Sequence, residues 1–301
     1  MSVLLQTNLL FPLSRRGKVR DVYDLGDKLL IVSTDRISAF DFVLPCGIPD
    51  KGKVLNQISA FWFEKTAHLV PNHLIKVIDG AAATNGLKES LGYSRGLPDY
   101  LTDRSMVVAK AERIPVECVV RGYLSGSAWA QYQETGTVSN MRLPSGMKES
   151  QELSRPIFTP TTKSETEHDH PLTEQDIDGL GVGDVLADLE QKSLLIYQYA
   201  RDYAEAKGIV IADTKFEFGL INGKLALIDE LLTPDSSRFW DASQYEAGHS
   251  QPSFDKQPVR DWLAASGWNK RPPAPMLPVE VIEATTQRYD KIYQLFTGKH
   301  I

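Results

Sequence analysis

The chain has 301 residues, of which 42% are hydrophobic and 24% are charged, and its net charge at pH 7 is −6. This composition is ordinary for a globular protein and supplies enough apolar material for one large or two interlocked domains. The acidic balance argues against a general nucleic-acid-binding protein, which would usually carry a basic surplus, but it allows a local basic pocket for phosphates.

The sequence indicates a protein with no membrane partner. Its apolar runs all fall short of the ~20 residues that a membrane-spanning helix needs. Arg15 and Arg16 follow the apolar N-terminal residues rather than precede them, so no secretory signal is predicted. Cys46 and Cys118 each lie in an apolar stretch, which favours two buried thiols in a reducing compartment over a nucleophilic cysteine. We therefore expect a cytoplasmic protein.

The first part of the chain is predicted to be rich in β-structure. Its expected elements are a hairpin, a helix and two buried strands, at residues 18–25 with 28–33, at 54–69, and at 105–110 with 116–120. Gly26-Asp27 would form the hairpin turn, and Pro115 the turn between the two buried strands.

The second part mixes helices with strands. Its expected elements are helices at residues 125–132, 186–206 and 278–297 and a hairpin at 209–230. Residues 143–172 hold several prolines and many hydroxyl side chains without a clear period, and loops this long are usually functional or disordered. Long loops between alternating strands and helices favour an α+β fold over a doubly wound parallel sheet.

The hairpin at residues 209–230 carries the most informative pattern. Because side chains alternate along a strand, Asp213, Lys215 and Glu217 share one face. Asn222-Gly223 lies between the two strands and predicts a tight turn there.

The length of this turn decides where the acid of the second strand points. A two-residue turn would pair Glu217 with Ile228 and mix acidic and apolar groups on each face. A three-residue loop over residues 221–223 with a glycine bulge would pair Lys215 with Asp229 and separate the charged face from the apolar face. We therefore expect the three-residue loop.

Three carboxylates around one lysine raise one another's pKa values unless a cation compensates for them. Mg²⁺ is the natural compensator because it takes oxygen ligands and bridges ATP phosphates. A solvated, salt-bridged hairpin face is the alternative. The apolar run at residues 209–212 suggests a buried strand and so favours a site.

Other segments collect polar groups at the ends of strands. The segment at 17–23 (GKVRDVY) could drape over phosphates or form an ordinary turn, and that at 33–41 (STDRISAFD) follows a buried strand. Arg121 together with a helix start at residues 125–127 would make an anion site, or else a capped helix with a surface arginine.

Two motif-like segments are rejected. Residues 47–53 imitate a phosphate-binding loop, but Val54 stands where a hydroxyl is needed and Pro49 removes a backbone donor. His168-Asp169-His170 has no third ligand at zinc spacing, so a solvated loop is expected there.

Taken together, six motifs closely resemble those of the SAICAR synthetase (phosphoribosylaminoimidazole-succinocarboxamide synthase) family, in its longer, fungal-type form with a single activity. They are GKVRDVY at 17–23, STDRISAFD at 33–41, IPVECVVRGYLSGS at 114–127, PIFTPTTKSE at 156–165, IADTKFEFG at 211–219 and DELLTPDSSRFW at 229–240. Asp50 departs from the pattern, because many members have glycine at that position.

The resemblance implies an ATP-dependent ligase of de novo purine biosynthesis. It would join carboxyaminoimidazole ribotide (CAIR) to L-aspartate and give SAICAR, ADP and phosphate, with an acyl-phosphate intermediate. The implied fold has a small β-rich lobe (residues 1–112) and a larger α+β lobe with the C-terminal helices (residues 113–301), distantly kinase-like, with ATP between them. ATP and Mg²⁺ would be the cofactors, the partners would be small molecules and no nucleic acid, and the protein would be a monomer.

The resemblance also implies roles for individual residues. The implied ATP-binding residues are Arg15, Gly17, Lys18, Val19, Arg20, Lys110, Glu112, Arg113, Ile114, Glu117, Glu217 and Asp229, the last two of which would also hold the metal. The implied substrate-binding residues are Asp35, Ser38, Arg121, Ser127, Asp213, Lys215 and Arg238, with Lys215 and Asp213 catalytic. The loop at residues 159–169 would close over the substrates.

Two rival functions are weaker. A kinase-like phosphotransferase would carry the His-Arg-Asp and Asp-Phe-Gly motifs, which this sequence lacks. A non-catalytic nucleotide-binding regulator would not need the acids and the lysine of the hairpin, all of which are present.

Overall fold

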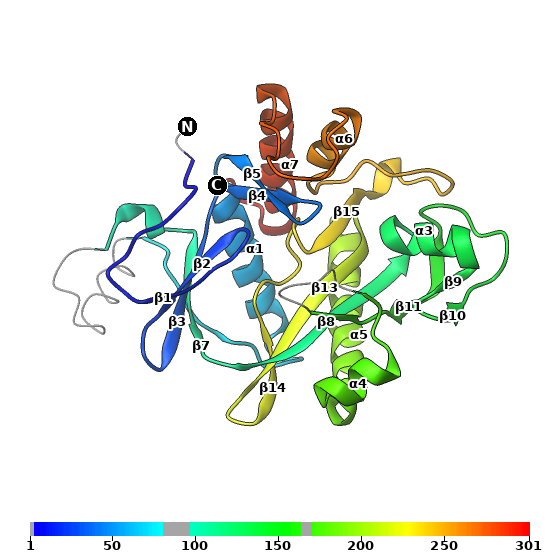
Figure 1. The fold of residues 1–301 in the computed structure, drawn as a ribbon, viewed down its shortest axis with the longest axis horizontal. Coiled ribbons are helices and arrows are strands. Elements are labelled where there is room, and N and C mark those ends of the chain that lie inside the picture. The colour runs from blue at the N-terminus through cyan, green and yellow to red at the C-terminus, as the bar shows by residue number, and fades with distance from the viewer. Residues whose placement is uncertain (1–2, 81–96, 164–169) are drawn as a thin grey trace. The chain divides into compact units, whose positions relative to one another are not determined.

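The computed structural model describes residues 3–80, 97–163 and 170–301 (Figure 1). The chain divides into two units, one formed by Met1–Glu64, His73–Lys110 and Asp255–Ile301, the other by Lys65–Asn72 and Ala111–Phe254. The C-terminal segment from Asp255 thus groups with the first unit, whereas the sequence assigned it to the second lobe. Both units combine helices with antiparallel sheets, so the predicted α+β class is confirmed.

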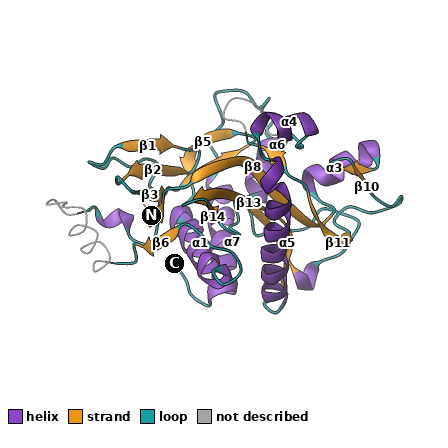
Figure 2. Ribbon diagram, turned by 90° about the horizontal axis from the view of Figure 1, so that it is seen from below, coloured by secondary structure: helices purple, strands orange, loops and turns teal. Residues whose placement is uncertain are grey.

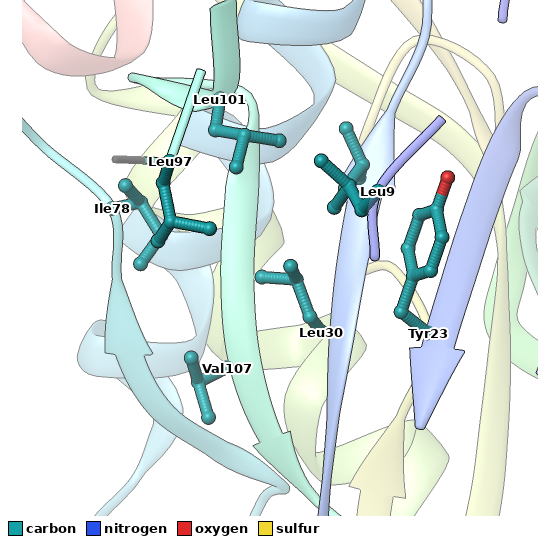
Figure 3. Close-up of a cluster of buried hydrophobic side chains, with 8 residues drawn as sticks. Leu9, Tyr23, Leu30, Ile78, Leu97, Leu101 and Val107 are labelled. Carbon is teal, nitrogen blue, oxygen red and sulfur yellow. The ribbon is translucent and has the colours of Figure 1, made fainter. Parts of the chain in front are cut away.

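The first unit is built on a five-stranded antiparallel sheet. In spatial order its strands are β1 (Leu13–Arg16), β2 (Arg20–Asp24), β3 (Lys28–Ser33), β7 (Ser105–Ala109) and β6 (Leu74–Val77). The predicted hairpin is the β2–β3 pair, and its turn is held by the Gly26 N–H, which donates to the Asp24 carboxylate over 2.7 Å. Tyr23, Leu30 and two valines from this sheet pack with Leu9 and Leu101 in a buried cluster (Figure 3).

The remaining elements of the first unit are helices and a second hairpin. They are β4 (Arg36–Ala39), β5 (Phe42–Gly47), α1 (Lys51–Thr66), the 3₁₀-helix η1 (Asp99–Leu101), α6 (Gln257–Ala265) and α7 (Val279–Thr297). Helices α6 and α7 pack on the β4–β5 hairpin through an apolar cluster that includes Ile37, Leu44 and Val259. The predicted helices at 54–69 and 278–297 correspond to α1 and α7. Helix α1 begins three residues early because the Gly52 N–H is satisfied by a distant carboxylate, Asp35, which the local pattern does not reveal.

The second unit is built on a sheet whose two long central strands are β8 (Glu112–Tyr123) and β13 (Ile209–Ile221). Around them lie β11 (Glu152–Phe158), β12 (Thr161–Thr162), β14 (Lys224–Ile228) and β15 (Ser237–Asp241). Helix α5 (Gly183–Glu205) runs along one face of the sheet (Figure 2), where the Tyr197 hydroxyl donates to the Ile211 carbonyl over 2.6 Å. The smaller elements are α3 (Gly126–Thr135), β9 (Thr137–Val138), β10 (Met141–Arg142), α4 (Glu174–Leu180) and the 3₁₀-helix η2 (Ala242–Gln244).

The expected turn at Pro115 is wrong, because Pro115 lies inside β8. Arg113 and Glu117 lie four residues apart on β8, yet they pair with Gly219 and Glu217, which lie two apart on β13. The extra residues form a bulge. A bulge tolerates a proline, because a residue in a bulge need not donate a backbone hydrogen bond to the neighbouring strand. The turn between the two predicted strands instead lies between Ala109 and Glu112.

The expected three-residue loop of the hairpin is also wrong. Ile221 pairs with Lys224, and Asn222 and Gly223 have φ values of 51° and 73°, so they form a two-residue turn with both residues left-handed. We had expected charged and apolar side chains to lie on opposite faces of the hairpin. This expectation does not apply, because β13 is a central strand and both of its faces are buried. Asp229 lies beyond the end of β14 with a φ of 69°, so strand alternation does not set its direction.

The long stretch at residues 143–172 is more ordered than we expected. It contains β11 and β12, both of which pair with β8, while residues 164–169 lie outside the described part. The predicted helices at 125–132 and 186–206 correspond to α3 and α5. Among the described residues, the structure contains no helix that is both long and apolar enough to cross a membrane.

Candidate active site

Arg121 and Glu117 of β8 lie on the same face of the sheet as the three charged side chains of β13. Asp213 pairs with Arg121 and Glu217 with Glu117, while the residues between them alternate to the face that α5 covers. The prediction that Asp213, Lys215 and Glu217 share a face is therefore confirmed. These side chains form two ionic clusters, an arginine cluster around Asp213 and an acid–lysine cluster around Glu217.

The arginine cluster is centred on the buried carboxylate of Asp213. Its Oδ2 accepts a hydrogen bond from Arg121 Nη1 over 3.2 Å and a second from Arg238 Nη1. Arg121 also donates from Nε to the Thr159 hydroxyl over 3.0 Å and from Nη2 to the Ser127 hydroxyl over 3.3 Å. Two guanidinium groups share one carboxylate, so the cluster carries surplus positive charge and suits an anion.

The start of helix α3 adds backbone donors to this cluster. Gly126 has a φ of 57°, and a Cβ there would lie 2.4 Å from Arg238 Nη2, so glycine lets the guanidinium approach the helix start. Ser125 occupies the N-cap position but makes no capping hydrogen bond, and its buried hydroxyl has no hydrogen-bond partner among the described residues. A helix N-terminus beside two arginines is a favourable place for a phosphate.

Burial affects the charge of Arg121 itself. It lowers the pKa of the guanidinium below its ordinary value, and the neighbouring Asp213 opposes this effect. Asp213 therefore stabilises the charged form of the arginine and holds it in place.

The acid–lysine cluster contains Glu117, Glu217, Lys215 and Lys163. Lys215 Nζ donates to Glu117 Oε1 over 2.7 Å, while Lys163 Nζ donates to Glu217 Oε1 and lies 3.3 Å from Glu117 Oε1. Burial alone would lower the pKa of Lys215, but Glu117 and Glu217 raise it above its ordinary value. Lys215 therefore remains an ammonium group at neutral pH and is unsuited to act as a base.

Asp229 lies close enough to Glu217 to influence its ionisation. Burial and the negative charge of Asp229 raise the pKa of Glu217, and Lys163 and Lys215 oppose this rise. Among the described residues, no three or more acidic, histidine or cysteine side chains gather into a metal site. Two carboxylates fit Mg²⁺ when substrate phosphates and water complete its shell, which is how this ion is usually held in phosphate-transfer sites.

The predicted phosphate loop of the first unit is a tight turn between β1 and β2. The Gly17 N–H donates to the Arg20 carbonyl over 2.7 Å, and Val19 is buried beneath the turn. Lys18 is half exposed, and its Nζ lies 2.6 Å from the Asp41 carboxylate. Arg15 lies on the exposed strand β1. The turn therefore presents basic side chains to solvent.

Asp35, which we expected to contact a substrate, is surrounded by hydrogen-bond donors of the protein. Its side chain is fully buried, and its oxygens accept hydrogen bonds from the Leu4 N–H over 2.7 Å, the Gly52 N–H over 2.9 Å and Arg104 Nη1 over 3.0 Å. These bonds tie the N-terminal segment to the start of α1, and the predicted substrate contact of Asp35 stays a prediction. Ser38, three residues further along the chain and within β4, is also buried.

The remaining candidates lie at the ends of strands or outside the clusters. Lys110 follows β7 and pairs with Asp24 over 2.8 Å. The first three residues of β8, Glu112, Arg113 and Ile114, lie beside the far end of β13, and Ile114 is buried.

The rejected candidates can be placed in part. His170 contacts the hydroxyl of Thr162 and the carboxylate of Asp176, while residues 168 and 169 lie outside the described part. Both cysteines are free and buried, and burial raises the pKa of Cys118 to about 12, which excludes a thiolate nucleophile there.

Sequence reasoning missed two residues of these clusters, Lys163 and Thr159. Lys163 and Thr159 lie in the motif at residues 156–165, but no local period or spacing pointed to their roles. Ser125 had been placed in the helix start of the expected anion site, but its unpartnered hydroxyl was not foreseen. A folded register was needed to bring β11 and β12 beside β8.

One end of this sheet face carries surplus arginine charge, and the other end carries paired carboxylates with lysines. This arrangement is typical of an enzyme that acts on substrates with several negative charges. Comparisons with known proteins identify its family. The profile of the SAICAR synthetase family matches residues 13–275. The chain is 51% identical over 299 residues to a phosphoribosylaminoimidazole-succinocarboxamide synthase of Thermodesulfovibrio yellowstonii, covering 99% of both chains.

The similar solved structures include two with a bound ligand. The SAICAR synthase of Saccharomyces cerevisiae in complex with SAICAR matches with a TM-score of 0.86 and 41% identity, over 99% of both chains. A SAICAR synthetase in complex with ADP matches with a TM-score of 0.68 and 25% identity, over 95% of this chain and 98% of the other. The chain belongs to the SAICAR synthetase family, as its motifs indicated. This family catalyses the ATP-dependent ligation of CAIR and aspartate in purine biosynthesis.

Proposed function

We propose that this chain forms SAICAR in two steps, with the acyl phosphate of CAIR as the intermediate and Mg²⁺ as the metal. A carboxylate is a poor electrophile, so one of its oxygens first attacks the γ-phosphorus of ATP and ADP leaves. The amine of L-aspartate then attacks the acyl carbon, the C–O bond to phosphate breaks, and the amine gives up a proton. The protein contributes mainly by positioning the reactants and neutralising their charges.

The observation that carries the proposal is the division of one strand face into two clusters. Asp213 and Glu217 are four residues apart on β13, which is roughly 13 Å along a strand. CAIR likewise carries a phosphate at one end and its reacting carboxylate at the other. Lys215 of the acid–lysine cluster lies between Asp213 and Glu217 on β13, where negative charge would develop as the phosphoryl group is transferred.

The arginine cluster is proposed to hold the ribotide phosphate. Arg121 and Arg238 would donate to it from their planar guanidinium groups, and Ser127 and the start of α3 would add further donors. The unpartnered hydroxyl of Ser125 suits the same task. Asp213 would keep both guanidinium groups in position.

The acid–lysine cluster is proposed to hold Mg²⁺ and the ATP phosphates. Glu217 and Asp229 would supply two carboxylate ligands, and the phosphates would supply others. When bound, the ion would neutralise and orient the phosphates of the nucleotide. Lys215, which remains protonated, would stabilise the charge that develops on the transferred group.

The other ATP-binding assignments come from the motif resemblance. They concern Arg15, Gly17, Lys18, Val19 and Arg20 of the β1–β2 turn, Lys110, and Glu112, Arg113, Ile114 and Glu117 of β8. The exposed ammonium of Lys18 suits a phosphate contact.

Isotope transfer tests the acyl phosphate directly. CAIR labelled with ¹⁸O in its carboxylate is incubated with ATP, Mg²⁺ and L-aspartate, and the released phosphate is examined by ³¹P NMR. We expect one labelled oxygen in each phosphate, because that oxygen forms the new bond to phosphorus. Unlabelled phosphate would refute the intermediate.

A second experiment tests the order of the steps. ATP labelled in its β–γ bridge is incubated with CAIR and without aspartate, and we expect the label to scramble into the non-bridging positions of the β-phosphate. Asp229→Asn should abolish both turnover and scrambling while its circular dichroism spectrum stays unchanged. Near-normal turnover of this variant would contradict the metal role of Asp229.

A further inference from the structure

Lys163 is held between two buried carboxylates by the short strand that precedes it. Thr161 and Thr162 of β12 pair with Glu117 and Val116 of β8, and the Lys163 N–H donates to the Pro115 carbonyl over 3.3 Å. This pairing directs the side chain toward Glu217, with which its Nζ forms an ion pair. The backbone of Lys163 is therefore fixed, and its flexible side chain extends into the acid–lysine cluster.

The cluster needs this charge in the absence of a ligand. The side chains of Glu117 and Glu217 are only 11% and 7% exposed, and Asp229 adds a third negative charge nearby. Buried carboxylates without counter-ions are strongly unfavourable. Lys215 is hydrogen-bonded to Glu117, so Lys163 supplies the positive charge that contacts Glu217.

We propose that Lys163 is a displaceable counter-ion, which neutralises Glu217 in the free enzyme and leaves it when a divalent metal binds with the nucleotide. The inference rests on the proposed metal role of Glu217 and Asp229. A lysine suits this task because its ammonium is a mobile point charge, whereas arginine is held by its planar fork. On leaving Glu217, the ammonium is free to donate to the phosphate oxygens that arrive with the metal.

This exchange makes metal binding depend on the nucleotide. Metal alone must displace Lys163 from Glu217 and leave its ammonium with Glu117 as its one acidic neighbour in the cluster, so metal alone binds weakly. Metal with nucleotide brings new acceptors for the displaced ammonium and binds more tightly. Lys163 is thus a positioning residue that links two binding events in the proposed reaction.

Mn²⁺ titration followed by electron paramagnetic resonance tests the idea without any measurement of activity. In nucleotide-free solution, Lys163→Met should bind Mn²⁺ about tenfold or more tightly than the unchanged protein, since a competing buried charge has been removed. Lys224→Met is the matched control, because Lys224 is an exposed lysine on β14 of the same sheet. It should bind Mn²⁺ as the unchanged protein does.

A titration with ADP present supplies the second half of the test. With ADP present, the tighter Mn²⁺ binding of Lys163→Met should disappear or reverse, because the phosphates of ADP then lack the ammonium group of Lys163. Equal or weaker Mn²⁺ binding by Lys163→Met in nucleotide-free solution overturns the proposal. If Lys163→Met does not fold, as judged by thermal melting, Lys163→Gln is measured and interpreted by the same criteria.

A double variant separates this proposal from the proposed function. Adding Asp229→Asn to Lys163→Met should remove the tight site. If the double variant still binds Mn²⁺ tightly, the assignment of the metal site itself fails, and with it the displacement from that site. If Asp229→Asn weakens Mn²⁺–ADP binding but Lys163→Met leaves nucleotide-free binding unchanged, the metal site stands and the counter-ion role of Lys163 is refuted.

Discussion

Replacing Asp35 by asparagine would show whether this motif residue serves the fold or a ligand. The substitution keeps the shape of the side chain but removes its charge and turns one acceptor into a donor. Three donors face it, namely two backbone N–H groups and Arg104, whose side chain is only 6% exposed. The variant therefore leaves a buried guanidinium without its anion and brings donors together.

Breaking a buried ion pair from one side costs about 3–5 kcal/mol. For chains of this size, a loss of 1 kcal/mol lowers the melting temperature by roughly 2–4 °C. We therefore expect Asp35→Asn to melt about 6–20 °C below the unchanged protein, as measured by circular dichroism.

Asp41→Asn is the matched control for this experiment. Asp41 belongs to the same motif and undergoes the same loss of charge, but its side chain is 56% exposed in a pair with Lys18. Its left-handed backbone suits asparagine, so a change of about 0.5 kcal/mol or less is expected. A melting temperature of Asp35→Asn within about 2 °C of the unchanged protein, together with a raised KM for a substrate, would show that Asp35 contacts a ligand.

Three further predictions address the sheet, the phosphate end and acid stability. Gly122→Ala would place a Cβ 1.9 Å from the Tyr197 hydroxyl, so we expect a loss of about 1–3 kcal/mol in urea unfolding; an unchanged midpoint would contradict this packing. Arg238→Lys should raise the KM for CAIR about tenfold in steady-state assays, because it loses the paired donors, whereas the KM for ATP should stay constant. Burial raises the pKa of Asp21, but hydrogen bonds, chiefly from Arg36, lower it below its ordinary value. The stability that Asp21 contributes should therefore be present above pH ~4 and be lost as pH falls through its folded pKa, so the melting-temperature deficit of Asp21→Asn should shrink on acidification; a constant deficit would refute it.

The sequence predicted those features that depend on local periodicity. The alternation of Asp213, Lys215 and Glu217 placed these three side chains on one face, and the register of β13 against β8 bears this out. Helices α5 and α7 were located from their apolar spacing. The motifs identified the family because the site is built from several segments, and the order and spacing of the motifs are specific to that combination.

The errors share a cause, which is that the competing interaction lies far away in the chain. The hairpin register was misjudged because the reasoning assumed one solvent face, whereas both faces of β13 are buried. Pro115 was taken for a turn because the bulge that accommodates it appears only when β13 lies alongside. The protein partners of Asp35, Leu4 and Arg104, were likewise not predicted, because they are remote from it in sequence.

One face of β13 carries the ionic side chains and the other packs against α5. This difference also determines where residues can be inserted or deleted. A single inserted or deleted residue within Ile209–Ile221 would exchange the faces beyond that point, burying a carboxylate against α5 and placing a phenylalanine among the ionic groups. Such a change would disrupt the core and the site together. An insertion at the exposed Asn222–Gly223 turn would leave both strand faces unaltered, so natural and engineered length variation should concentrate there.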